Sequence, residues 1–367
     1  MVFIKPILLD APNLGELEKK YLCDCIDSTF VSSVGENIGI FENKFAEYLK
    51  AKKAVSTQSG TAAIHLALYE LGIGPGDEVI VPVLTFVATV NPIKYVGATP
   101  VFVDIDLETW NMDPNEVERH ITNKTKAIIP VHLYGNPCDM DKIMEISKKY
   151  NIPVLEDATE SLGATYKDKF TGTFGEINAF SFNGNKIMTT GGGGMIVTND
   201  EEKADHLKFL VNQARDESKG YYHPEIGFNY RMTNLEASLG LAQFERLPDF
   251  LNKKRKFAEI YKQGFENNEK ITFQKSYEGA ISSYWLPSIK VESHKTIPEI
   301  QKELKEKGIP TRRIFVPIVE FPPYREYKKE EYKNAYEIYK KGLNLPGSTM
   351  NDEEQIEYII NMLKEVI

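Results

Sequence analysis

The chain has 367 residues, of which 42% are hydrophobic and 26% are charged, and its net charge at pH 7 is −9. This composition is typical of a globular protein large enough for two domains, and the acidic balance without a basic block argues against a nucleic-acid partner. No apolar run approaches the ~20 residues that span a bilayer and the start lacks the apolar core of a signal peptide, so we expect a cytoplasmic protein with no membrane partner.

Between about residues 50 and 200, short β-rich runs alternate with segments of helical periodicity. Strands are expected at 52–57, 77–82, 99–106, 125–135, 152–158, 178–182 and 193–200, with helices at 60–72, 85–97 and 139–151. Because most of these strands are unbroken apolar runs, they predict an α/β fold with a mostly parallel central sheet and helices on both faces. Ligands bind such sheets at the carboxyl ends of the strands.

The pattern changes after residue 233. Thr233 and Glu236 form a capping box that predicts the start of a helix, and a strand-like run follows much later at 283–291. The intervening segments are rich in lysine and glutamate. We expect a large cofactor-binding α/β domain over residues 1–249 and a smaller α+β domain over residues 250–367.

The cysteines Cys23, Cys25 and Cys138 cannot all pair with one another. No histidine or further cysteine cluster accompanies them, so they make a poor metal site. We expect reduced thiols and no bound metal.

One lysine, Lys186, lies between a short apolar strand and the four glycines 191–194. A nucleotide phosphate loop requires glycine directly before its lysine and serine or threonine after it, whereas Asn185 and Ile187 flank Lys186. The alternative is a lysine that forms a Schiff base, which must be neutral to attack a carbonyl. A lysine taken at random is more often solvated at the surface, so the neighbouring groups decide.

Asp157 ends one of the predicted strands, and a buried carboxylate there requires a cation. The protonated ring nitrogen of pyridoxal 5′-phosphate (PLP) is such a cation. An aspartate at this position is equally typical of a helix N-cap.

The junction at Ser59, Gly60 and Thr61 offers free backbone N–H groups to a phosphate, although a plain N-cap is the commoner use. Ser181 can add a hydroxyl, and Phe86 can stack on a flat ring, although a lone aromatic is usually core. Together and in this order, these groups predict that PLP is held as a covalent Schiff base at Lys186. The glycines would let backbone pass close to it.

The chain resembles the nucleotide-sugar aminotransferases of the DegT/StrS type almost from end to end. The resemblance is carried by segments that include SGTAAIHLAL, GDEVIVPVLTFVATVNPI, EDATESLGA, SFNGNKIMTTGGGGMIVTND and EIGFNYRMTNLEASLGLAQFERL. It implies a fold-type I PLP-dependent transferase that works as a homodimer, with active sites at the subunit interface.

The resemblance also implies roles for individual residues. Lys186 would be the PLP-bearing lysine and general base, and Asp157 the partner of the ring nitrogen. The implied cofactor contacts are Phe86 on the ring, Gly60, Thr61 and Ser181 on the phosphate, Glu160, and Asn229 reaching the phosphate from the other subunit. The implied substrate contacts are Arg231, for which a surface ion pair is the alternative, and Asn185.

Glu160 stands where many members of this family have glutamine, and SFNGNK replaces a histidine-containing form. Both variants resemble the subgroup that aminates carbon 4 of UDP-4-keto-6-deoxy-N-acetylhexosamines, for bacillosamine- or legionaminic-acid-type sugars of bacterial surface glycans. We therefore expect transfer from L-glutamate to that ketone. The alternatives are a 3-keto- or another 4-keto-sugar aminotransferase acting on dTDP- or GDP-linked substrates, a PLP lyase, and a nucleotide-sugar sensor without turnover. Intact Lys186 and Asp157 argue against the sensor.

Overall fold

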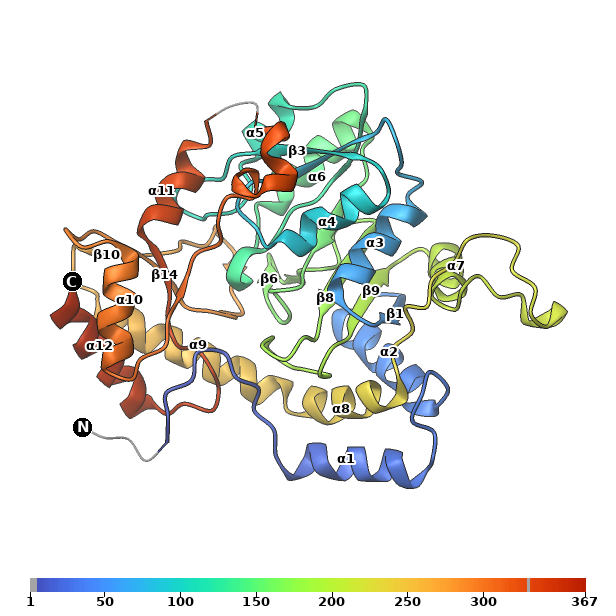
Figure 1. Cartoon of the computed structure of the whole chain (residues 1–367), viewed down its shortest axis with the longest axis horizontal. Helices are drawn as coiled ribbons and strands as arrows, with labels where there is room; N and C mark the ends of the chain where they lie inside the picture. The colour runs from blue at the N-terminus through green and yellow to red at the C-terminus, as the bar shows by residue number, and fades with distance from the viewer. Residues whose placement is uncertain (1–4, 329–330) are drawn as a thin grey trace.

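The computed structural model describes residues 5–328 and 331–367 (Figure 1). Its central sheet has the strand order β3-β2-β4-β5-β8-β9-β1, in which isolated bridges join β4 to β5. The bounds are β1 (Lys53–Thr57), β2 (Glu78–Pro82), β3 (Thr99–Val103), β4 (Thr125–Ile128), β5 (Leu155–Asp157), β8 (Ile177–Ser181) and β9 (Gly194–Thr198).

The sheet is mostly parallel, which confirms the sequence-based expectation. Strand β9 is the exception, because it runs antiparallel to both of its neighbours, β8 and β1. A parallel neighbour needs a crossover, usually a helix, and the loop between β8 and β9 contains none. This loop carries Lys186, so the reversal of the chain keeps the lysine at the carboxyl end of β8.

Helices cover both faces of the sheet. They are α2 (Glu36–Leu49), α3 (Gly60–Glu70), α4 (Val87–Tyr95), α5 (Pro114–Arg119), α6 (Met140–Tyr150), α7 (Glu201–Val211) and α8 (Asn234–Glu245), and α1 (Glu16–Asp27) packs on the outside of α8. Strand β2 shows the two faces directly, because Val79 and Val81 pack in the cluster that contains Leu66 of α3, whereas Ile80 packs with Ile143 of α6. Thr233 caps α8 with Glu236 in a capping box, as predicted.

A second, antiparallel sheet lies in the C-terminal part of the chain, with the order β10-β12-β14-β13. Its strands are β10 (Ile271–Phe273), β12 (Ser288–Val291), β13 (Arg312–Arg313) and β14 (Gly342–Asn344), packed with helices α9 (Leu247–Gly264), α10 (Ile297–Glu306), α11 (Lys333–Lys341) and α12 (Glu353–Val366). The minor strands β6 (Thr165–Tyr166), β7 (Lys169–Phe170) and β11 (Ala280–Ile281) form a separate small sheet.

The strand-like run 283–291 is a strand only over Ser288–Val291. Tyr284 has a left-handed backbone with a φ of 48°, and Pro287 has no N–H to donate to a ladder. These two residues explain why the strand begins late.

Helix α9 connects the two hydrophobic clusters. Its Phe250 and Leu251 pack in the core of the large sheet, whereas Phe257 and Tyr261 pack in the C-terminal core. The proposed domain division at residue 250 therefore falls inside a continuous helix. In the described ranges, no helix is both long and apolar enough to cross a membrane.

The N-terminal segment before α1 is held by the far end of the chain. Leu8 and Asn351 exchange hydrogen bonds of 2.8 and 2.7 Å, and the N–H of Gly347 donates to the carbonyl of Leu9 at 2.8 Å. Ile7 packs in the C-terminal core. Residues 7–9 therefore belong structurally with the C-terminal part of the chain (Figure 1).

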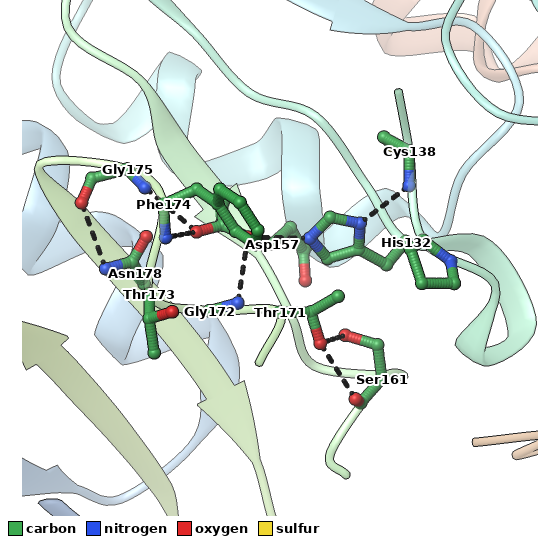
Figure 2. A network of polar contacts seen from close by, with 12 residues as sticks. His132, Cys138, Asp157, Ser161, Thr171, Gly172, Thr173, Phe174, Gly175 and Asn178 are labelled. Atoms are coloured by element: carbon green, nitrogen blue, oxygen red, sulfur yellow. Dashed lines mark hydrogen bonds and ion pairs between the residues drawn. The ribbon is translucent and has the colours of Figure 1, made fainter. Parts of the chain in front are cut away.

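A buried carboxylate, Glu156, fixes the end of β5. His132 Nε2 donates to its Oε2 at 2.8 Å, as does the backbone N–H of residue 172, and the N–H groups of residues 174 and 175 donate to its Oε1 (Figure 2, in which the donor residues are labelled). The N–H of Cys138 donates to His132 Nδ1 at 3.1 Å, so the ring proton lies on Nε2 and points to Glu156. The turn 172–175 is thus tied to β5.

This turn generates a stability prediction. Gly172 has a φ of +79°, and an added Cβ would lie 2.1 Å from the ring of buried Phe180. Gly308 has nearly the same φ, +78°, with open space around it. We expect Gly308→Ala to cost about 1 kcal/mol of backbone strain and Gly172→Ala at least about 3 kcal/mol, because overpacking adds to the strain. Denaturant unfolding of both variants measures this, and equal losses would contradict the clash.

Candidate active site

A cavity of about 460 Å³ is lined by residues at the carboxyl ends of the parallel strands. It brings together most of the residues singled out from the sequence: Gly60, Thr61, Phe86, Asp157, Glu160, Ser181, Asn185 and Lys186. It also includes residues that the sequence analysis missed: Thr85, Thr89, Trp285, Arg312 and Phe315.

Asp157 is 2% exposed at the end of β5. Its Oδ2 accepts a hydrogen bond of 2.7 Å from the Thr89 hydroxyl, and its Oδ1 accepts one of 3.1 Å from the backbone of Thr159. The ion pairs between described lining residues and their neighbours are Lys186 with Glu160 and Arg312 with Asp10, and Asp157 belongs to neither. Because a buried carboxylate is costly without a cation, this position suits a positively charged ligand group.

Lys186 is nearly buried, with 13% of its side chain exposed. Its Nζ lies 3.9 Å from Glu160 Oε1 and 4.1 Å from the centroid of the Trp285 ring. Burial lowers the pKa of Lys186, and this outweighs the opposing effect of Glu160 and Asp157. A lowered pKa makes the neutral amine available, which a nucleophile or general base requires.

Glu160 is also buried, and its Oε2 accepts a hydrogen bond of 2.8 Å from the backbone N–H of Tyr134. Burial raises the pKa of Glu160 to about 7, although the nearby charge of Lys186 lowers it. This carboxyl group therefore changes charge near neutral pH, directly beside the lysine.

The start of α3 forms one wall of the cavity. Ser59 is the N-cap and accepts a hydrogen bond of 3.1 Å from Ala62, while Gly60 and Thr61 are the first helical residues, whose N–H groups have no partner within the helix. A Cβ at Gly60 would lie 2.9 Å from that of Ser181. Glycine is therefore required where this helix meets the end of β8.

The glycine run packs mainly against this helix start. A Cβ at Gly194 would lie 2.5 Å from the carbonyl oxygen of Ser59, and the N–H of Gly193 donates to Gln58 at 2.8 Å. Gly192 and Gly193 also line the cavity. The run thus brings β9 against α3, and close approach to a ligand is limited to these two glycines.

Phe86 is 52% exposed, and its ring centroid lies 5.6 Å from that of Phe315. Asn229 is exposed and Arg231 is half-buried, and neither lines the cavity. The Nε of Arg231 is buried and lacks a hydrogen-bond partner within the described chain. A single chain therefore does not bring Asn229 and Arg231 to Lys186.

The cavity residues that the sequence analysis missed have little or no signal in the local sequence. Thr89 follows Thr85 by one helical turn, and their hydroxyls lie 2.9 Å apart, but this spacing alone does not point to Asp157. Trp285 and Arg312 come from the C-terminal part of the chain, and no local pattern connects them with Lys186.

The cavity offers N–H groups at the start of a helix and a serine hydroxyl, a buried carboxylate that lacks an ion-pair partner, an exposed aromatic ring and a buried lysine. This set of groups fits the phosphate, the ring nitrogen, the ring face and the aldehyde of PLP, respectively. The observation that carries the fit is Asp157, a buried carboxylate that faces the cavity and has no ion-pair partner among the described residues, because a cationic ligand group there would be stabilised by it.

Comparisons with known proteins agree with this chemistry. The sequence profile of the DegT/DnrJ/EryC1/StrS aminotransferase family matches residues 12–364. GDP-perosamine synthase of Escherichia coli O157:H7 is 46% identical, with 99% of each chain covered, and that of Caulobacter vibrioides is 42% identical, with 98% of each covered. A Streptococcus pneumoniae protein assigned as a sugar aminotransferase, solved in its PLP form, superposes with a TM-score of 0.93 at 31% identity, covering 99% of this chain and 98% of that one.

Glu160 generates a prediction for the protein without cofactor. The folded state keeps the Glu160 proton up to about pH 7, whereas the unfolded state releases it near 4.5. Ionisation therefore costs the folded state free energy as pH rises through this window. We expect Glu160→Gln to gain stability relative to wild type between about pH 5 and pH 8, on the order of 1–3 kcal/mol.

Guanidinium denaturation at each pH measures this difference. Glu145→Gln, an exposed position on α6, is the matched control for the loss of one carboxyl group. A stability difference between Glu160→Gln and wild type that stays constant with pH would show that Glu160 does not ionise in this window.

Proposed function

Because the chain belongs to the DegT/DnrJ/EryC1/StrS aminotransferase family, we propose that it moves an amino group from L-glutamate to the C4 ketone of a GDP-linked 4-keto sugar. The chain is a PLP-dependent sugar aminotransferase of nucleotide-sugar biosynthesis. The nucleotide, the ketone position and the amino donor are the parts that we propose.

The choice of GDP rests on the names of two similar relatives, both GDP-perosamine synthases. The UDP-4-keto-6-deoxy-N-acetylhexosamine expected above rested on Glu160 and on the segment SFNGNK. These relatives favour the GDP-linked alternative over it. We place the reaction in the cytoplasm, where the free thiols of Cys23, Cys25 and Cys138 would remain reduced.

We propose that the N–H groups of Gly60 and Thr61 and the hydroxyl of Ser181 hold the phosphate of the cofactor. Phe86 would stack on the ring, and Asp157 would keep a proton on the ring nitrogen. Thr89 and the backbone of Thr159 orient the carboxylate of Asp157 for this task. Glu160, which lies beside Lys186, would contact the cofactor there.

PLP, when bound, supplies an aldehyde that takes up the amino group and a protonated ring that stabilises negative charge on the reacting carbon. Lys186 Nζ accepts the proton from the α-carbon of the amino donor, because burial makes its neutral form accessible. Glu160 lies 3.9 Å from this amine and adjusts its charge. Burial of Lys186 and Glu160 keeps water away from the proton that is moved.

The observation that carries the proposal is that Lys186 and the unpaired carboxylate of Asp157 line one cavity. A nucleotide-sugar sensor needs a complementary surface but neither a buried amine with a lowered pKa nor a charge held for a ring nitrogen. The arrangement therefore supports turnover rather than binding alone.

Turnover of GDP-, UDP- and dTDP-linked 4-keto and 3-keto sugars with L-glutamate, read by mass, tests the proposal. We expect the GDP-linked 4-keto sugar to react fastest. Lys186→Ala should fall below about a thousandth of the wild-type rate, since it lacks the amine that moves the proton. A preference for a UDP-linked or 3-keto substrate would overturn the substrate assignment. A turnover rate of Lys186→Ala close to that of wild type would overturn the role of the lysine.

We further propose that the enzyme is a homodimer in which Asn229 completes the phosphate site of the partner. The segment between α7 and α8 forms an arm that extends away from the body of the molecule (Figure 1), and Asn229 lies at its base, bridged to Asn212. The arm exposes Tyr221 and Ile226, which are 86% and 72% accessible. Exposed apolar side chains of this size are typical of a protein–protein interface.

Mixing two inactive variants tests the shared site. Lys186→Ala and Asn229→Asp should each be severely impaired, but in a mixed dimer one of the two sites would have both residues intact. We therefore expect partial recovery of activity under conditions in which subunits exchange. Differently tagged subunits provide the control for exchange, and heterodimers as inactive as their parents would show that Asn229 does not serve a partner.

A further inference from the structure

Arg312, in β13, brings a second positive charge to the cavity. Among the described residues that line it, the basic side chains are those of Lys186 and Arg312. Lys186 is committed to the reaction itself. Arg312 is 35% exposed, so its guanidinium is accessible from the cavity to a ligand.

The guanidinium is held in place by the N-terminal segment. Its Nη1 lies 2.8 Å from Oδ2 of Asp10, and the same oxygen accepts a hydrogen bond of 3.0 Å from the side chain of Asn185. Asp10 is 12% exposed, and the segment around it is fixed by the hydrogen bonds of Leu8 and Leu9 to the C-terminal part of the chain. Arg312 is thus oriented rather than freely mobile.

The charge of Arg312 acts on the reacting groups. It contributes to lowering the pKa of Lys186 and also lowers that of Glu160. The guanidinium is therefore close enough to influence both the amine and the carboxyl group. The next residue, Arg313, differs, because it stacks on Tyr339 at 3.9 Å and donates to the carbonyl of that residue at 3.3 Å.

We propose that Arg312 binds the α-carboxylate of the amino donor, with Asp10 as the residue that positions its guanidinium. This inference rests on the proposed function and adds the group that recognises the donor. An α-amino acid brings a negative charge into a cavity that already contains the carboxylates of Asp157 and Glu160. Binding there requires a compensating cation, and a guanidinium can hold a carboxylate through two parallel N–H groups.

The position of Arg312 favours the amino acid over the diphosphate of the sugar nucleotide. The α-carboxylate is bonded to the carbon that carries the reacting amine, so it must lie next to Lys186 during the reaction. The diphosphate is attached at the opposite side of the sugar ring from a C4 ketone. A cation that acts on Lys186 is therefore suited to the carboxylate.

The test uses α-methyl-L-glutamate, which has no α-proton to lose and so binds without turnover. Its dissociation constant is measured by calorimetry on the PLP-loaded wild type and on Arg312→Gln, Arg312→Lys and Arg313→Gln. We expect Arg312→Gln to weaken binding by at least about 30-fold. Arg312→Lys should weaken it by less, because lysine keeps the positive charge but lacks the two parallel N–H groups of the guanidinium. Arg313→Gln should stay within about twofold, since it removes an equal charge outside the cavity.

A parallel titration with GDP separates the two anionic substrates. GDP affinity should be unchanged in all variants. Weakened GDP binding with unchanged α-methyl-L-glutamate binding would overturn the inference in favour of the diphosphate, and two unchanged affinities would leave Arg312 a purely structural partner of Asp10. Equal weakening of both would reveal a general distortion and also overturn it.

Arg312→Lys keeps a cation beside Asp10, so it tests the proposal even if Arg312→Gln does not fold. The binding measurement needs no keto sugar. Failure of every sugar in the substrate panel would therefore count against the proposed function alone, whereas a normal donor affinity in both Arg312 variants would count against this inference alone.

Discussion

Two consecutive carboxylates, Glu156 and Asp157, are buried at the end of one central strand. Strand geometry sends their side chains to opposite faces of the sheet, so each charge must be balanced separately. The protein gives Glu156 four hydrogen bonds, from His132 and three backbone N–H groups, whereas Asp157 receives two, from Thr89 and the backbone of Thr159. Folding thus satisfies the first carboxylate more fully, whereas the second faces the cavity and is suited to a cationic ligand group.

The different surroundings of Glu156 and Asp157 explain how β5, β9 and α3 are arranged around the cavity. The donors to Glu156 hold the end of β5 rigidly, and a rigid strand end keeps Asp157 at a fixed place in the cavity. The reversed strand β9 keeps Lys186 nearby, and its glycines let that strand contact the start of α3. Burial lowers the pKa of Lys186 and raises that of Glu160, and in each group it outweighs the opposing effect of the other's charge. Arg312 adds to the lowering at Lys186.

Much of the large domain and the core of its site could be predicted from local sequence, because strand-to-helix alternation and the residues that follow each strand are neighbours along the chain. Lys186, Asp157 and Gly60 are found this way. Trp285 and Arg312 are not, since only tertiary packing brings them to Lys186. The late start of β12 depends on the backbone of Tyr284, which composition does not reveal. The UDP-linked substrate expected from the sequence was inferred from Glu160 and the segment before Lys186, which lie beside the reactive lysine, whereas the similar relatives favour the GDP-linked alternative.

The hydrogen bonds between Leu8 and Asn351, together with the contact of Asp10 with Arg312, make the two ends of the chain one functional unit. Recombination between related genes would separate them if it exchanged only the C-terminal third. Such a chimera would inherit Arg312 from one parent and its orienting aspartate from the other. Viable crossovers should therefore come in pairs, with the short N-terminal segment travelling together with the distant C-terminal domain.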